Sequence, residues 1–264
     1  MGDDYVIGAV MGEGLVGPRF AGRYRPSGHP VALEEIPHEL LARPDFVERL
    51  AVSGRLAASL TATHVVRVYD LVRVAHRLYV VNELCRGRSL AALMGPETLP
   101  LPSALAVADS VLAGLEEIHA AGMVHGDIRP EVVVVTAQGQ VRIGSLGLAA
   151  VLAADSTMGA WPSVAPPEGG APSVAADLYA AGVLLQQLVS GLEAGVGQWA
   201  GPARLGVLVA RATATAPQER FQSAAEFRGE LERTAAALLG QEWRNQSELA
   251  ARVARPLGPP QSRP

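Results

Sequence analysis

The spacing of apolar residues becomes mainly helical after about residue 85, and this change limits the folds that the chain can adopt. Three stretches within residues 5–36 predict short strands with Gly-rich turns: YVIGAVMGEG, RFAGRYR and HPVALEEI. A helical pattern follows at 44–60, with Asp45 as the expected cap. Residues 64–74 and 77–84 then return to strand patterns. The first 84 residues therefore predict a small antiparallel sheet with one helix.

Helical patterns dominate the rest of the chain. Residues 101–122 predict a long amphipathic helix that ends at Gly122, and residues 175–191 are apolar on nearly every face, as in a buried helix. Two more helices are expected at 202–213 and 222–239, the second with a Ser223 cap. The prediction is an α+β fold of two lobes. The expected units are an N-terminal lobe at 1–84, a C-terminal lobe at 85–239, and a tail at 240–264 with one helix and a Pro-rich end.

Composition narrows the classes of partner. With 264 residues and 49% hydrophobic content, the chain can bury a large core. The net charge of −4 is spread over interleaved acids and bases, so we expect neither nucleic acid nor an anionic membrane as a partner. The single Cys85 excludes an internal disulfide framework, and no apolar run resembles a signal peptide or a membrane span. A cytoplasmic protein is expected.

All 22 basic residues are Arg, and the chain has no Lys. The simplest explanation is the nucleotide composition of a high-GC genome. Whatever the cause, chemistry that needs a Lys ammonium is not available to this chain.

The stretch MVHGDIRPEVVVV, residues 123–135, carries the most specific motif. It resembles the catalytic loop H-R-D-x-K-P-x-N of protein kinases, with His125, Gly126, Asp127, Arg129 and Val132 at five of its positions. Further landmarks follow in the same order, so residues 5–236 resemble a bacterial Ser/Thr protein kinase of the eukaryotic-like type. The resemblance implies a bilobal kinase fold with a nucleotide cleft between the lobes.

Several positions of that cleft depart from the family pattern. Gly12, Gly14 and Gly17 match a G-x-G-x-x-G loop, although a Gly-rich hairpin explains them equally well. Arg19 stands where the family has a Val over the adenine ring, and Glu34 of VALE stands in the Lys position. A carboxylate there reverses the sign of the interaction with phosphates. We therefore expect Arg19 to reach Glu34 and to fill the space of a nucleotide.

The metal-binding positions differ as well. Ser53 stands where the family's helix has its Glu, and Ser145, before Leu146, stands where the metal-binding stretch has its Asp. Val132 replaces the Asn that holds a second metal, and neither a hydroxyl nor an apolar side chain is a good Mg²⁺ ligand. No metal and no cofactor is therefore expected. The resemblance assigns the vestigial cleft to these residues: Gly12, Gly14, Gly17, Arg19, Ala32, Glu34, Asn82 at the gatekeeper position, and Val134.

Positions that hold the family's architecture together are retained. Asp127 matches the catalytic base, and His125 and Leu146 resemble members of the spine that joins the lobes. Asp177 resembles the helix Asp that bonds the backbone of the catalytic loop. Glu168 and Arg220 resemble a buried ion pair that ties the activation segment to the helical lobe.

This asymmetry favours a degenerate family member, a pseudokinase that is not an enzyme and acts as a protein-binding scaffold or regulator. The expected partner is an active Ser/Thr kinase or a phosphopeptide-binding adaptor. Two surfaces are candidates: the segment with Ser156, Thr157 and Trp161, and the tail with Trp243, Leu249 and Val253. Packing of the tail on its own lobe is the favoured alternative to partner binding.

Two other functions stay open. One is an atypical kinase or nucleotidyl transferase that uses Asp127 and the glycines, with residual ATP binding. The other is a small-molecule sensor that uses the altered cleft.

Overall fold

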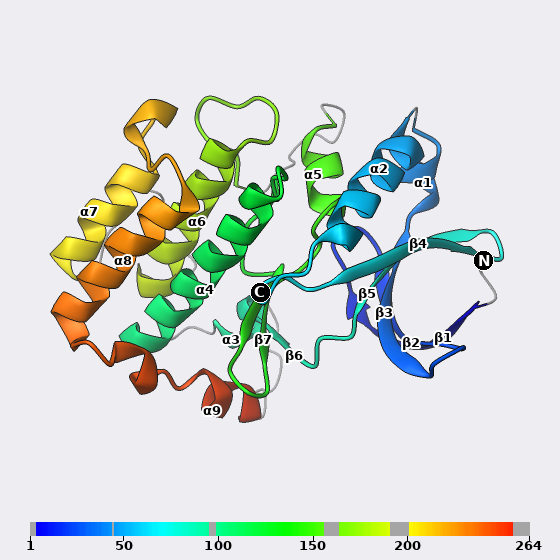
Figure 1. Ribbon diagram of the computed structural model, residues 1–264, viewed down its shortest axis with the longest axis horizontal. Coiled ribbons are helices and arrows are strands. Elements are labelled where there is room, and N and C mark those ends of the chain that lie inside the picture. Colours follow the sequence, from blue (N-terminus) through cyan, green and yellow to red (C-terminus); the bar gives the residue numbers. More distant parts are fainter. Residues whose placement is uncertain (1–3, 44, 95–98, 156–163, 191–200, 256–264) are drawn as a thin grey trace, which may run out of the picture.

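The computed structural model describes residues 4–43, 45–94, 99–155, 164–190 and 201–255. Figure 1 shows two lobes, with the strands β1 to β5 on one side and a bundle of helices on the other. The predicted two-lobed α+β architecture is confirmed.

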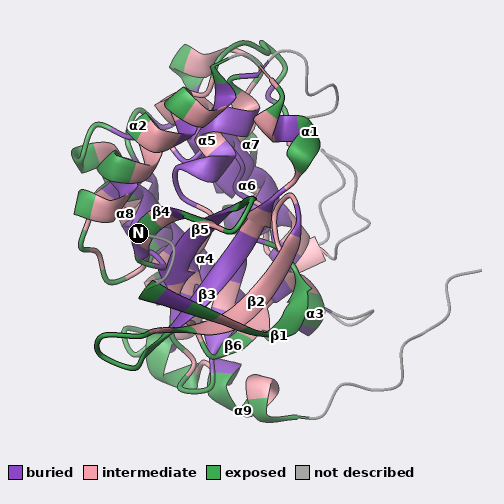
Figure 2. Cartoon of the chain, turned by 90° about the vertical axis from the view of Figure 1, so that its right-hand side faces the viewer, coloured by how far each residue is buried: buried purple, intermediate pink, exposed green. Residues whose placement is uncertain are grey.

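The small lobe is built on a five-stranded antiparallel sheet in the order β1-β2-β3-β5-β4. Its strands are β1 Tyr5–Glu13, β2 Pro18–Tyr24, β3 His29–Ile36, β4 Val68–Val74 and β5 Arg77–Glu83. Leu33 of β3 and Val81 of β5 are fully buried, and Figure 2 shows these central strands as the most buried part of the sheet. Leu33 and Val81 belong to a small cluster within this lobe, whereas Ile36 of β3 and Leu78 and Val80 of β5 join the main core.

Two helices, not one, accompany this sheet: α1 His38–Leu41 and α2 Phe46–Ser59. The short α1 follows Pro37, whose carbonyl accepts from the amides of Leu40 and Leu41. The expected Asp45 cap is wrong. Asp45 has φ 57°, in the left-handed region, and makes no capping bond with its side chain, whereas an N-cap residue has extended backbone.

β4 begins at Val68, later than the pattern from residue 64 predicts. Residues 64–66 instead join the large lobe: the amide of Val66 donates to the carbonyl of Ile143 at 2.8 Å, and the amide of Ile143 donates to the carbonyl of His64 at 2.8 Å. This contact ties the two lobes together behind the cleft.

The large lobe is mainly helical. Its helices are α3 Leu90–Leu93, α4 Leu101–Ala120, α5 Leu148–Ala153, α6 Val174–Ser190, α7 Ala203–Ala212 and α8 Ala224–Leu239, and its small sheet has β6 Gly87–Ser89, β7 Val133–Thr136 and β8 Val141–Ile143. A Cβ on Gly182 of α6 would lie 2.6 Å from Cβ of Ala212, so this glycine lets α6 approach α7 closely. Within the ranges given above, no helix combines the length and the apolar character needed to cross a membrane.

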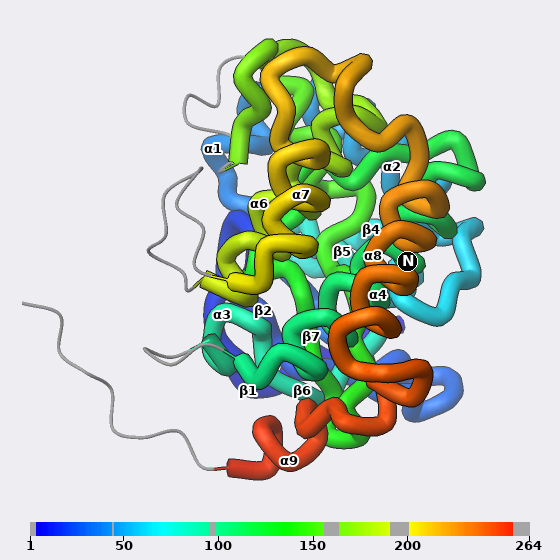
Figure 3. Tube along the Cα trace, turned by 90° about the vertical axis from the view of Figure 1, so that its left-hand side faces the viewer, coloured from blue at the N-terminus to red at the C-terminus, as the bar shows by residue number. Residues whose placement is uncertain are grey.

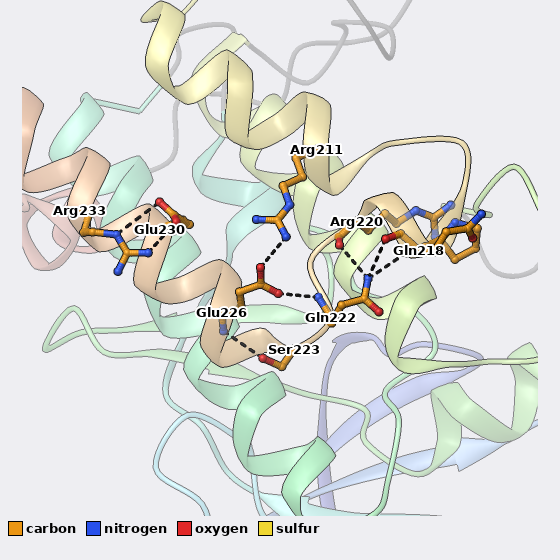
Figure 4. Close-up of polar contacts among 9 residues, drawn as sticks. Arg211, Gln218, Arg220, Gln222, Ser223, Glu226, Glu230 and Arg233 are labelled. Carbon is orange, nitrogen blue, oxygen red and sulfur yellow. Dashed lines mark hydrogen bonds and ion pairs between the residues drawn. The ribbon is translucent and has the colours of Figure 1, made fainter.

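The start of α8 is fixed by a reciprocal cap, drawn in Figure 4. The hydroxyl of Ser223 accepts from the amide of Glu226 at 3.1 Å, and the carboxylate of Glu226 accepts from the amide of Gln222 at 2.8 Å. Arg211 of α7 donates to the same carboxylate at 2.5 Å. The bond from the Gln222 amide, together with Arg211, lowers the pKa of Glu226. The predicted Ser223 cap is present.

Residues 240–255, the described part of the predicted tail, pack on the large lobe. This part forms a short 3-10 helix, η4 Trp243–Gln246, and α9 Leu249–Ala254. Trp243 is fully buried, Leu249 is 3% exposed, and both belong to the main core. Figure 3 shows α9 at the end of the large lobe, next to β6 and β7. The favoured alternative for Trp243 and Leu249, packing on the lobe, is therefore what the fold contains.

Candidate functional site

A cleft between the lobes contains most of the predicted cleft residues. An inner chamber of about 50 Å³ is lined by Arg19, Ala32, Asn82 and Val134 among others. An outer groove of about 440 Å³ is lined by Gly12, Gly14, Arg19 and Val134. Both are also lined by Met11, Cys85, Glu131, Val132 and Ser145, so they form one continuous space. Gly17 and Glu34 lie beside this space without lining it.

Sequence reasoning missed several residues of this lining. Glu83 and Cys85 follow Asn82 closely at the end of β5, so their place in the chain could have identified them as lining residues. Val66 could not be found this way, because it reaches the chamber only through the contact of residues 64–66 with β8.

Glu34 carries a buried charge directly beside the cleft, and its side chain is only 2% exposed. One carboxylate oxygen accepts from the amides of Leu15 at 2.5 Å and Val16 at 3.2 Å, both in the glycine-rich turn between β1 and β2. The other accepts from a guanidinium nitrogen of Arg19 at 3.3 Å. Two amides and one cation thus offset the cost of burying this carboxylate. The expected ion pair between Arg19 and Glu34 is present. The expectation that Arg19 fills the space of a nucleotide is wrong, because Arg19 lines an outer groove of about 440 Å³ that its side chain leaves open.

The glycines of the turn allow this contact. A Cβ on Gly14 would lie 2.4 Å from the carboxyl carbon of Glu34, and a Cβ on Gly17 would lie 2.5 Å from the carbonyl oxygen of Glu35. The amide of Gly14 donates to the carbonyl of Gly17 at 2.7 Å, which closes the turn. Gly14 and Gly17 therefore let the backbone fold directly onto β3, with the Glu34 carboxylate against its amides.

The far wall of the cleft is joined to α2. The hydroxyl of Ser53 donates to the carbonyl of Gly147 at 2.9 Å. Ser145 lines both cavities with φ 63°, and Leu146 beside it is 2% exposed. Ser53 therefore contacts the backbone of the Ser145–Leu146–Gly147 stretch. Both Ser53 and Ser145 carry a hydroxyl group where the family has a carboxylate.

The loop at 123–132 is buried and well bonded. Asp127 is 2% exposed, and Nε of Arg129 donates to its carboxylate at 2.7 Å. Val132 is 5% exposed and lines both cavities. The loop thus keeps an acid with a guanidinium beside it.

The carboxylate of Asp177 in α6 binds the backbone of this loop. Its carboxylate accepts from the amides of His125 at 2.9 Å and Gly126 at 2.8 Å, and it lies 2.8 Å from Nε2 of His119. His125 is fully buried, and its Nε2 lies 2.8 Å from the carbonyl oxygen of Gly144. The expected contact of Asp177 with the loop backbone is therefore present.

Glu168 and Arg220 form a two-pronged ion pair, with nitrogen–oxygen distances of 2.7 and 2.5 Å. The Arg220 side chain is fully buried, but that of Glu168 is 29% exposed, so the expectation of a buried pair holds for only one partner. The reason is that Glu168 lies on a surface loop. Arg220, in contrast, also donates hydrogen bonds to the backbone carbonyls of Ala214 and Ala175. The hydrogen bond from Arg220 lowers the pKa of Glu168.

Comparison with known proteins decides the family. The family model described as "Protein kinase domain" matches residues 5–198. The chain belongs to the protein kinase family. The serine/threonine-protein kinase PknL of Mycobacterium tuberculosis is 28% identical to this kinase domain over 272 residues, covering 91% of this chain and 68% of PknL. The serine/threonine-protein kinase PkaB of Streptomyces coelicolor is 31% identical over 208 residues, covering 72% of this chain and 49% of PkaB.

A solved structure supports the same fold. The crystal structure of the Mycobacterium tuberculosis PknI kinase domain superposes with a TM-score of 0.75 at 24% identity, covering 89% of this chain and 97% of that one. The glycine-rich turn, the loop at 123–132 and the cleft between them are thus parts of a protein kinase fold.

The expectation that this chain is not an enzyme is contradicted. Its relatives PknL and PkaB are named serine/threonine-protein kinases, and its fold matches a kinase domain. That prediction considered each altered position separately. Folding keeps Asp127 and Arg129 together in the catalytic loop, an arrangement that substitutions elsewhere in the cleft do not remove.

The protein kinase family implies a magnesium-bound nucleotide in the cleft. The residues present do not fit that group in the arrangement seen here. The Leu15 and Val16 amides are bonded to the Glu34 carboxylate, and Arg19 is paired with it. Ser145 and Val132 bring no carboxylate toward a cation. Among the residues described, no cluster of three or more His, Cys, Asp or Glu side chains could hold a metal ion.

Ser156, Thr157 and Trp161, the other predicted partner surface, lie outside the described residues.

Proposed function

We propose that this chain is a regulatory protein kinase domain of bacterial Ser/Thr phosphorylation signalling that acts by binding another protein. The partner is an active Ser/Thr kinase or an adaptor that binds phosphopeptides. One observation carries the proposal: the glycine-rich turn, which holds phosphates elsewhere in the family, is bonded to the chain's own Glu34. Within the large lobe, Asp177 holds the loop at 123–132 and the Glu168–Arg220 pair holds the segment before α6, while the contact of residues 64–66 with Ile143 joins the two lobes. Such a frame supplies a stable surface without a nucleotide.

Thermal unfolding of the full chain with ATP, with and without Mg²⁺, tests the first half of this proposal. We expect no stabilisation, because phosphates would have to displace a paired carboxylate. A ligand at a hundred times its dissociation constant would add about 2.7 kcal/mol to the free energy of unfolding. A clear rise in melting temperature with magnesium and ATP would therefore contradict the proposal.

Binding to active kinases tests the second half. The full chain is titrated into each active Ser/Thr kinase domain of its own organism, and the rate at which that kinase phosphorylates a peptide is measured. We expect at least one kinase to bind and to change its rate. If every kinase keeps its rate and shows no binding at micromolar concentrations, the regulatory role is wrong.

Phosphate transfer to Ser or Thr is the second candidate, favoured by the names of PknL and PkaB and by the Asp127–Arg129 pair. Transfer of labelled phosphate from ATP to a panel of peptides tests it, with Asp127→Asn as the control. Transfer by the natural chain that the variant loses would support this candidate, and no transfer by the natural chain would set it aside.

A further inference from the structure

We infer that a pocket of aromatic side chains on the outer face of the small-lobe sheet binds the Pro-rich end, residues 256–264, of a second copy of this chain. The inference goes beyond the regulatory role proposed above and needs neither a nucleotide nor another kinase. It rests on four rings around one pocket, on the charges beside them, and on the spacing of prolines in the tail.

The register of the sheet brings the four rings together. Tyr5 of β1 lies opposite Tyr24 of β2, and Tyr24 lies opposite His29 of β3, so three of the rings form a row across the sheet. Residues opposite each other on neighbouring strands point to the same face. Tyr69 of β4 adds the fourth ring, and its hydroxyl lies 3.2 Å from Nε2 of His29. All four side chains line one pocket.

The pocket lies away from the cleft. It has a volume of about 230 Å³, and Val31 of β3 also lines it. The neighbouring residue Ala32 lines the cleft instead, and successive residues of a strand point to opposite faces. The pocket is therefore on the outer face of the sheet. Hollows lined by aromatic rings are typical docking sites for Pro-rich segments.

Charges of both signs lie beside the pocket. Burial raises the pKa of Tyr5 to about 12, and the carboxylates of Asp70 and Asp4 act in the same direction. The guanidinium of Arg67 lies 5.7 Å from the ring centroid of Tyr69. A small cation would therefore be attracted by the two acids and repelled by Arg67. A segment with a single cation among uncharged residues fits better, because its cation can approach the acids while uncharged residues pack on the rings.

The end of the chain has this composition. Residues 256–264 read PLGPPQSRP, in which Pro256 and Pro259 are three residues apart and Arg263 is the one charged side chain. They follow α9 and lie outside the described residues. The polyproline II conformation has three residues per turn, so this spacing puts Pro256 and Pro259 on the same face of a bound segment. The tail thus offers two prolines to the rings and one guanidinium to the acids.

The segment and the pocket belong to different lobes. α9 ends in the large lobe, where the carbonyl of Arg255 accepts from Arg88 at 2.7 Å, whereas the four rings lie on β1 to β4 in the small lobe (Figure 1). Nine extended residues span about 30 Å at most. The contact is therefore assigned to a neighbouring molecule, with the tail of one copy in the pocket of the next.

Sedimentation of the full chain over a series of concentrations tests the inference. We expect the natural chain to self-associate as its concentration rises. An excess of a synthetic peptide of residues 256–264 should return it to the monomer, because the peptide occupies the pocket. The same peptide with Pro256→Ala and Pro259→Ala should leave the association unchanged.

Variants identify the two sides of the contact. Tyr69→Ala removes a ring of the pocket, and the double change Pro256→Ala and Pro259→Ala removes the prolines of the tail. Each variant alone should self-associate about tenfold more weakly than the natural chain. An equal mixture should associate more tightly than either variant alone, because the tail of one still meets the intact pocket of the other. His76→Ala, at an exposed histidine between β4 and β5, is the control and should behave like the natural chain.

Three results would overturn the inference. The natural chain could stay monomeric at every concentration, its association could persist in excess peptide, or the mixture could associate no better than the separate variants. The first two results need only the natural chain, so they decide the question even if Tyr69→Ala does not fold. None of these measurements contains a nucleotide or another kinase, so they leave the test of the regulatory role separate.

Discussion

Glu34 and Arg19 form an ion pair between neighbouring strands beside the cleft. The carboxylate stands on the central strand β3, directly across from Arg19 on β2, so the sheet register itself brings the two charges together. Because β3 is buried, the pair is shielded from water on the carboxylate side. The pairing follows from the register of two adjacent strands, which the sequence pattern predicts well.

A double-mutant cycle measures this pair. We expect Arg19→Met and Glu34→Gln to be non-additive, with a coupling energy of about 1 to 2 kcal/mol, because a charged hydrogen bond is lost only once. Urea unfolding of the natural chain, both single variants and the double variant gives the value. Additive effects within error would mean that Arg19 and Glu34 do not stabilise each other.

Glu168 makes stability depend on pH. Its pKa is lowered in the folded chain by the hydrogen bond from Arg220, while the unfolded value is about 4.3. A lowered folded pKa contributes stability that is present above about pH 4.3 and is lost as the pH falls through the folded value. The natural chain should therefore exceed Glu168→Gln in stability at neutral pH, and the difference should shrink in acid. Urea midpoints at several pH values check this, and a difference that grows in acid would contradict it.

The cap of α8 is a prediction about one helix. Ser223→Ala removes the acceptor for the Glu226 amide and should lower the free energy of unfolding by about 1 kcal/mol. Ser223→Asp keeps an acceptor at the N-cap and should lose much less. Chemical denaturation of both variants provides the measurement. Equal losses in the two would show that the cap contributes little.

Strands and helices with a clear period were predictable, and those set by distant contacts were not. The patterns at 5–36 and 101–122 match β1 to β3 and α4 closely, because residue spacing and Gly-rich turns are local signals. The start of β4 was missed because residues 64–66 bond to Ile143, far away in the chain. The short α1 and the uncapped Asp45 depend on the turn between β3 and α2, for which the sequence carried no periodic signal.

The described part of the tail, residues 240–255, contributes to the folded core. Trp243 is fully buried in the main cluster, and Arg244 beside it bonds Asp109 of α4 at 3.2 Å. Trp243→Ala should therefore cost about 3 to 5 kcal/mol of stability. Val207→Ala, at an apolar residue that is 70% exposed, is the control and should change stability by less than about 0.5 kcal/mol. A small effect of Trp243→Ala would mean that the tail is only loosely attached.

For the chain as a whole, the frame of the site was easier to predict than its use. Asp177, Glu168 and Arg220 could be placed from the sequence because their contacts belong to the fold. The bonds from Leu15 and Val16 to Glu34 could not, because they depend on the path of a turn. The prediction that the chain is not an enzyme was wrong. It was based on single altered positions, whereas the relatives PknL and PkaB are named serine/threonine-protein kinases.

The proposed function depends on the Glu34 carboxylate being the internal ligand of the glycine-rich turn. Amide hydrogen exchange at Leu15 and Val16, followed by NMR in the natural chain and in Glu34→Ala, tests this most directly. We expect exchange at both amides to become about tenfold faster in the variant, the loss of about one hydrogen bond. Glu35→Ala, at the neighbouring carboxylate, should leave both rates unchanged. Equal rates at Leu15 and Val16 in the natural chain and in Glu34→Ala would contradict the account.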